Sequence, residues 1–161
     1  MVESYTPKEF IPVETSIHVF QAESSWNQLA TNEKLYAYYM ARAAWEGSKI
    51  SWFQRSYESP ALFVLLKLVF CQGIDTLKER ATKDGVSETE WRQFLAYSAA
   101  VFQNCGNFKS FGDTKFVPEL SMEQFLAVVK SSQAYVDKTH EIELILSRTL
   151  AEIYSEEKPL A

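Results

Sequence analysis

Apolar residues recur at helical spacing through most of this chain, beginning near Thr31. Thr31 is a favourable N-cap, and Leu35, Tyr39 and Trp45 follow it on the three-to-four-residue repeat of an amphipathic helix. Gly47 stands at the end of this run and is expected to interrupt it. The pattern therefore predicts a first long helix whose regular part ends near Gly47.

The middle of the chain carries its most apolar stretch. Ser59 and Pro60 provide an N-cap followed by proline in the first turn, and the run from Leu62 to Phe70 is apolar on nearly every side. A helix of this kind is expected at the centre of the core. A shorter helix is predicted from Asp75 to Lys83, ending before Gly85.

Two capping boxes mark later helix starts. Ser87–Glu90 and Ser121–Gln124 each place a serine three residues before an acid or amide, so that side chain and backbone cap each other. A last helix is predicted from about Asp137 to Ser155. The glycines and proline of residues 104–118 predict a loop between the two capped helices.

The expected fold class is mainly α. Five glycines and five prolines in 161 residues are few for a chain rich in hairpins. Residues 1–24 are expected to form an extended N-terminal segment, in which Ser16–Phe20 alternates as a short strand would. Residues 25–161 are expected to form an irregular bundle of about six helices.

Charge and composition narrow the possible functions. The net charge is −5 with both signs interspersed, so no basic surface for nucleic acid is expected. The longest apolar run, Ala61–Phe70, contains Lys67 and is too short to cross a bilayer, and the N-terminus lacks the pattern of a secretory signal. Cys71 and Cys105 are expected to be reduced thiols of a cytoplasmic protein without membrane partners.

Aromatic residues are abundant, with eleven Phe, eight Tyr and four Trp. Large aromatic side chains pack in cores more often than they form ligand cages. The four tryptophans are therefore expected to be core residues: Trp26, Trp45, Trp52 and Trp91.

The histidines do not form a metal-binding pattern. A hydrolytic zinc site needs about three protein ligands, and the chain has two histidines, His18 and His140. His140 precedes Glu141, but the positions for a second histidine on the same helix hold Leu144 and Ile145, expected core residues. No metal or other cofactor is expected to be bound by this chain alone.

The loop at 104–118 has two interpretations on its residues alone. A loop of about fifteen residues between helices is long enough to suggest function, and it carries amides, lysines and aromatic rings that suit an extended peptide. Equally, Phe108, Phe111 and Phe116 could anchor an ordinary turn to the core, with Asp113 and Thr114 as local caps.

One segment of this loop, Gly106–Pro118, has the sequence GNFKSFGDTKFVP and closely resembles the N-terminal lobe of dipeptidyl peptidase III. Glu33–Tyr38 with Ala41–Trp45 resembles the family's first long helix. Phe94–Phe102 resembles the helix that leads into the loop. The resemblance extends over about residues 30–120 and is most specific in the loop.

The resemblance implies a cytoplasmic, two-lobed zinc exopeptidase that releases dipeptides from the N-terminus of short peptides. One lobe would carry zinc on a His-Glu-x-x-x-His helix, and this chain would supply the beginning of the other. Its partners would be short peptide substrates, the remainder of the N-terminal lobe and the zinc lobe. The matching loop would line the substrate cleft, giving these candidate residues: Asn107, Lys109, Ser110, Phe111, Gly112, Asp113 and Lys115.

Without the zinc ligands, the chain alone is expected to be inactive. The alternative is a stand-alone helical module that binds peptides or a protein partner without catalysis. The two differ in the surface that they expose. Part of a larger enzyme should expose apolar side chains where further segments pack, whereas an independent module should have a polar surface.

Overall fold

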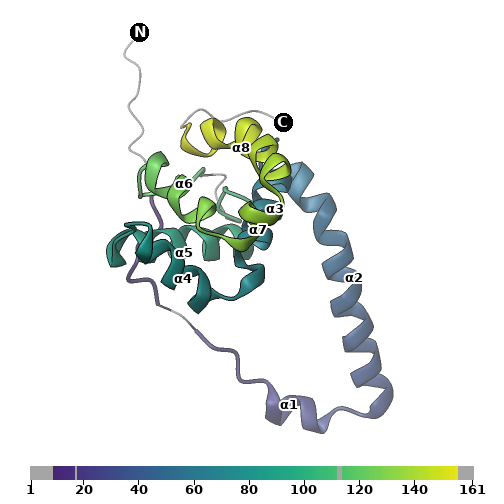
Figure 1. Ribbon diagram of the computed structural model, residues 1–161. Helices are drawn as coiled ribbons and strands as arrows, with labels where there is room; N and C mark the ends of the chain where they lie inside the picture. The colour runs from purple at the N-terminus through teal and green to yellow at the C-terminus, as the bar shows by residue number, and fades with distance from the viewer. Residues whose placement is uncertain (1–8, 17, 112–113, 156–161) are drawn as a thin grey trace.

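The computed structural model describes residues 9–16, 18–111 and 114–155, and these form an all-helical structure (Figure 1). The mainly α fold is therefore confirmed. Within this described part there are eight α-helices and one 3₁₀ helix, more than the predicted number. Their bounds are α1 Glu23–Gln28, α2 Thr31–Arg55, α3 Ser59–Val69, η1 Phe70–Gln72, α4 Ile74–Lys83, α5 Glu88–Asn104, α6 Met122–Lys130, α7 Gln133–Asp137 and α8 Thr139–Tyr154.

Both predicted capping boxes are present. The Ser87 hydroxyl accepts a hydrogen bond from the Glu90 backbone N–H at the start of α5, and the Glu90 carboxylate accepts one from the Ser87 N–H. Ser121 and Gln124 make the same reciprocal contacts at the start of α6. These boxes satisfy backbone groups that the first helical turns leave without partners.

The core is built around α3, as predicted. Leu62, Leu65, Leu66 and Val69 have no exposed surface, and they belong to a buried cluster with residues of α4, α5, α6, α7 and α8. Figure 1 shows α4 to α8 grouped around α3. In this part of the chain no single helix is long and apolar enough to cross a membrane; only the sharply bent pair α3–η1 with α4 reaches that length and composition, and the inner face of α3 is core.

The helices differ from the sequence prediction at one boundary and by two additional short helices. α2 continues through Gly47 to Arg55, because a single helical glycine weakens a helix without ending it. α1 is a short additional helix before α2. α7 is a second short additional helix, which ends where the Lys138 backbone (φ −137°, ψ 41°) is not helical, and the predicted last helix is present as α8.

α2 projects from the bundle (Figure 1). None of its 25 residues is buried, and its C-terminal end is anchored where the Trp52 ring stacks on Phe63 of α3 at 4.0 Å between ring centroids. The core prediction for the tryptophans is therefore correct for Trp91, which is 3% exposed, and wrong for Trp26 and Trp45, which are 43% and 70% exposed. These two tryptophans lie on α1 and α2, away from the core.

Residues 9–14 of the N-terminal segment lie against the bundle, and the chain then leads away from it to α1 (Figure 1). The Val117 N–H donates to the Glu9 carbonyl (3.0 Å), and Arg92 of α5 forms an ion pair with Glu14 (2.7 Å). The predicted strand Ser16–Phe20 includes residue 17, which is outside the described residues, and its other positions are not in a strand. The only β pairing among the described residues is an isolated antiparallel bridge between Phe108 and Lys115.

Candidate functional site

The loop after α5 begins with a change of chain direction at Cys105 and Gly106. Cys105 adopts the left-handed conformation (φ 54°), and the Gly106 N–H donates to the Val101 carbonyl at 3.0 Å. Gly106 has φ 146°, and a Cβ atom there would lie 2.3 Å from the Ser59 hydroxyl oxygen of α3. Only glycine fits this position, because any side chain would collide with the start of α3.

Beyond Gly106 the loop forms a short hairpin-like turn. The Lys109 N–H donates to the Thr114 carbonyl (2.9 Å), and the Phe116 N–H donates to the Asn107 carbonyl (3.0 Å). These bonds flank the bridge between Phe108 and Lys115. Phe108 and Phe116 are buried, so the base of the turn is fixed by apolar packing as well as by backbone pairing.

A buried polar cluster lies beneath this turn. Glu58, between α2 and α3, accepts hydrogen bonds at Oε1 from Asn107 Nδ2 (2.8 Å) and Lys115 Nζ (3.0 Å). The Asn107 Oδ1 atom accepts from the hydroxyls of Ser56 (3.2 Å) and Ser59 (3.4 Å). We call these five residues the Glu58 cluster. All five are buried, so the loop is joined to the α2–α3 junction by polar contacts that water does not reach.

The electrostatics of the cluster favour an ionised Glu58. Burial by itself would raise the pKa of the Glu58 carboxyl, but hydrogen bonds from Asn107 and Lys115 and the charge of Lys115 outweigh it. The pKa of Glu58 is therefore lowered from its ordinary value. An ionised carboxylate beside a buried ammonium group is the arrangement in which both charges are compensated.

Lys115 is held on three sides. Besides Glu58, its Nζ atom donates to the Glu152 carbonyl near the end of α8 (2.9 Å) and lies 5.7 Å from the centroid of the Phe108 ring. The residue is 7% exposed. Lys115 therefore ties the loop to α8, and its ammonium group is occupied by contacts within the protein.

The tip of the loop is exposed and is oriented by the ends of two helices. Asn104 of α5 accepts hydrogen bonds at Oδ1 from both the N–H and the hydroxyl of Ser110 (2.9 Å each). Arg55, the last residue of α2, reaches the Ser110 hydroxyl at 3.4 Å. The Phe111 side chain is 94% exposed, and Lys109 forms an ion pair with Glu9.

The seven predicted cleft residues thus have different environments. Asn107 and Lys115 belong to the buried Glu58 cluster, Lys109 is partly buried, and Ser110 and Phe111 are exposed at the tip. Gly112 and Asp113 are outside the described residues. Sequence reasoning did not identify Glu58 or Arg55, because nothing in the local pattern distinguishes them from other charged residues near a helix end.

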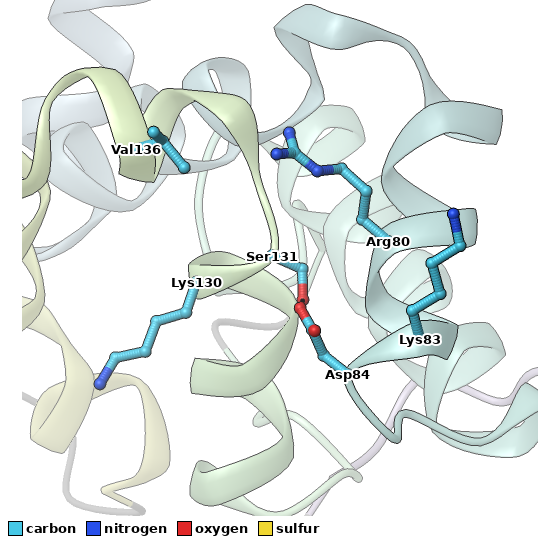
Figure 2. A pocket seen from close by; sticks show the side chains of 6 residues that line it. All are labelled: Arg80, Lys83, Asp84, Lys130, Ser131 and Val136. Carbon is cyan, nitrogen blue, oxygen red and sulfur yellow. Dashed lines mark hydrogen bonds between the residues drawn. The ribbon is translucent and has the colours of Figure 1, made fainter.

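A separate hollow of about 390 Å³ lies between α4, α6 and α7, away from the loop. Figure 2 shows the side chains that line it, with the Ser131 hydroxyl directed at Asp84; the oxygens are 2.6 Å apart. The hollow is open and its walls are Arg80, Lys83, Asp84, Lys130, Ser131 and Val136. It contains none of the predicted cleft residues.

Across the described ranges, no three His, Cys, Asp or Glu side chains are grouped so that they could hold a metal ion. His140 is exposed on α8. Leu144 is also exposed (47%), so the expectation that it belongs to the core was wrong, whereas Ile145 packs at the edge of the core. No zinc ligand can be assigned within this part of the chain.

Comparison with known proteins finds several relatives that carry the same name. No family model matches the sequence. The chain is 40% identical over 148 residues to "Dipeptidyl peptidase 3" of Nematostella vectensis, a match that covers 90% of this chain and 20% of the relative. It is 38% identical over 133 residues to the Homo sapiens protein of the same name (82% and 18%), and 36% identical over 126 residues to that of Dictyostelium discoideum (78% and 18%).

The matched stretch includes most of the described helices, and the chain spans about one fifth of the length of these relatives. Identities of 36–40% over about four fifths or more of the chain agree with the resemblance seen in the loop and the two helices before it. This chain therefore belongs to the dipeptidyl peptidase 3 family and corresponds to the N-terminal part of those proteins.

Proposed function

We propose that this chain supplies one wall of the substrate cleft in a peptidase that releases dipeptides from the N-terminus of short peptides. The support is the 36–40% identity to proteins named dipeptidyl peptidase 3. Because the chain spans about a fifth of those proteins, the activity is assigned to the whole enzyme. The zinc that the resemblance implies is assigned to the other lobe, where it would polarise the scissile carbonyl and activate water.

The single observation that carries the cleft assignment is an exposed loop tip on a rigid base. The Glu58 cluster and two buried phenylalanines fix the base, while Phe111 is 94% exposed above it. Binding residues are commonly found on loops that a rigid scaffold positions. An exposed aromatic ring at a fixed tip costs little conformational entropy when it contacts a ligand.

The tip offers a particular chemistry. The Phe111 ring suits an apolar peptide side chain, and Arg55 lies within reach of Ser110 beside it. Asn107 and Lys115 are used by the Glu58 cluster, so in this proposal they position the loop and do not contact substrate. Lys109 is paired with Glu9 and is assigned the same supporting part.

A hybrid enzyme tests the proposal. This chain replaces the matching segment of the human relative, and release of dipeptides from a tetrapeptide is followed by mass spectrometry. We expect the hybrid to be active and the chain alone to be inactive. A hybrid that does not fold, as judged by circular dichroism, or that folds without releasing dipeptides would overturn the proposal.

The loop assignment has its own matched pair of variants. Phe111→Ala in the hybrid is expected to lower kcat/KM about tenfold through a raised KM, because an aromatic contact worth about 1.4 kcal/mol is lost. Phe20→Ala is the control, since Phe20 is 96% exposed and lies outside the loop. Equal kcat/KM values for the two variants would remove Phe111 from the cleft.

The stand-alone module is less well supported. An independent module should have a polar surface, yet α2 exposes Tyr36, Trp45 and Phe53 among other apolar side chains. This favours the interpretation of the chain as part of a larger enzyme.

A further inference from the structure

Helix α2 has an unusual composition for an exposed helix. Eight of its large apolar side chains are more than half exposed, and they are Leu35, Tyr36, Tyr38, Tyr39, Met40, Trp45, Ile50 and Phe53. Soluble proteins rarely expose so many large apolar side chains on one element unless it is an interaction site. The helix has 25 residues and is roughly 37 Å long, so this surface extends well beyond the bundle.

The apolar side chains occupy opposite sides of α2. Tyr38 and Trp45 are seven residues apart and share one side, whereas Tyr36 and Met40 are four residues apart and share the other. A helix that is apolar on all sides is normally enclosed by other structure. Apolar side chains on one side of a helix could be buried by a single flat partner surface. Those of α2 are buried only if other polypeptide contacts the helix on more than one side.

The described part of this chain does not supply that cover. The Trp52 ring of α2 packs against Phe63 of α3. Figure 1 shows that α2 meets the bundle near its C-terminal end. α1, at the other end, has no buried residue. The apolar surface between these two ends is left for another polypeptide segment.

We infer that α2 is the docking surface for the polypeptide that forms the other four fifths, approximately, of dipeptidyl peptidase 3 proteins. This inference rests on the proposed function, and it names the surface through which that part is held. The chain matches only 18–20% of the length of its relatives, so they contain ample further sequence to enclose a helix on several sides. A second copy of this chain fits less well. Two α2 helices paired side by side would bury only one side of each helix and leave the apolar side chains on the other side exposed.

The charges of α2 agree with such an occupant. The helix carries Lys34, Arg42, Lys49 and Arg55 against Glu33 and Glu46, whereas the whole chain has a net charge of −5. The Arg42 guanidinium lies 5.9 Å from the Tyr38 ring centroid, within the apolar surface. The segment that covers α2 is therefore apolar, and the acidic neighbour of Arg42 is Glu46 of α2 itself.

Hydrogen exchange tests the inference with the complete chain and with the hybrid described above. In the chain alone, the amides of 31–51 exchange rapidly, because a helix without tertiary packing is marginally stable. In the hybrid the same amides are expected to exchange at least about tenfold more slowly. Equal exchange in the two proteins, or a hybrid that fails to fold, would overturn the inference.

A pair of charge substitutions adds a second measurement. Trp45→Glu is expected to lower the melting temperature of the hybrid and to leave that of the chain alone unchanged. The control is Ile74→Glu: Ile74 is 53% exposed at the start of α4, where an acidic residue is compatible with the helix dipole, and neither protein should change. Equal melting temperatures for the Trp45→Glu hybrid and the unsubstituted hybrid would contradict the docking surface.

Two further outcomes are informative. If the chain alone sediments as a dimer that Trp45→Glu dissociates, the surface belongs to a second copy and the inference is wrong. If α2 is protected in a hybrid that releases no dipeptides, the docking surface stands and the proposed function fails. Dipeptide release with an unprotected α2 would give the reverse conclusion.

Discussion

The Lys115 ammonium group lies 3.0 Å from Oε1 of Glu58, and both side chains are buried. The two residues are far apart in the sequence, one at the α2–α3 junction and the other at the base of the loop. Their contact, with those of Asn107 and Gly106, fixes where the loop lies relative to α3. Buried ion pairs are costly to break by removing one partner, because the other charge is left without compensation.

The first prediction concerns the loss of this pair. Glu58→Gln keeps an acceptor for Asn107 but leaves the Lys115 charge uncompensated, so the free energy of unfolding should fall by about 3 kcal/mol or more. Lys115→Met should cost a similar amount. The double variant should lose at least about 1 kcal/mol less than the sum, because no unpaired charge remains. Urea unfolding measures all three, and strictly additive losses would contradict the coupling.

The second prediction is the pH dependence of stability. The pKa of Glu58 is lowered in the folded protein from an ordinary value of 4.5, so its contribution is complete above pH 4.5 and is lost as the pH falls through the folded pKa. Urea unfolding between pH 6 and pH 3 should show a shallower acid destabilisation in Glu58→Gln. The pKa of Glu90 is also lowered by its hydrogen bonds to Ser87, but this affects both proteins equally. Identical pH profiles would refute the assignment.

A third prediction compares two glycines. Gly106→Ala would place a methyl group 2.3 Å from the Ser59 hydroxyl at a φ of 146°, so it should destabilise the fold by about 2 kcal/mol. Gly47→Ala has no atom within 4 Å of the added methyl group and lies inside α2. It should be neutral or stabilise the helix by up to about 1 kcal/mol. Thermal unfolding of both variants measures the two changes in stability. A destabilising Gly47→Ala would argue against a continuous α2.

A fourth prediction separates two tryptophans. Trp91→Ala removes a side chain that is 3% exposed and should cost about 3–5 kcal/mol of unfolding free energy. Trp45→Ala alters one that is 70% exposed and should cost less than about 0.5 kcal/mol in the chain alone. Similar losses for the two in urea unfolding would mean that α2 packs on the bundle after all.

The elements that sequence reasoning located best are those with local chemical signals. Ser87 and Ser121 begin helices because a side-chain hydroxyl and a later acid or amide satisfy backbone groups, and this requires only four neighbouring residues. The central position of α3 was also predictable from neighbouring residues, because a helix that is apolar on nearly every side is normally buried.

The features that could not be predicted depend on distant residues. Trp45 has the large aromatic side chain that is typical of a core residue. Its exposure follows only from the direction in which α2 leaves the bundle. Asn107 and Lys115 were expected at the cleft, but their partner Glu58 is in another element, so their burial could not be inferred from the loop. The close approach of Ser59 to Gly106 could not be predicted either, because the two residues belong to different elements.

The hydrogen bond from Val117 to Glu9 has a consequence for how the loop can be studied. Residues 104–118 take their shape from Glu9 at one end of the chain, Glu58 in the middle and the Glu152 carbonyl near the other. A synthetic peptide of those fifteen positions would lack all three contacts and would not adopt this conformation. Competition experiments with isolated loop peptides would therefore be uninformative, and any recognition by the tip requires the assembled fold.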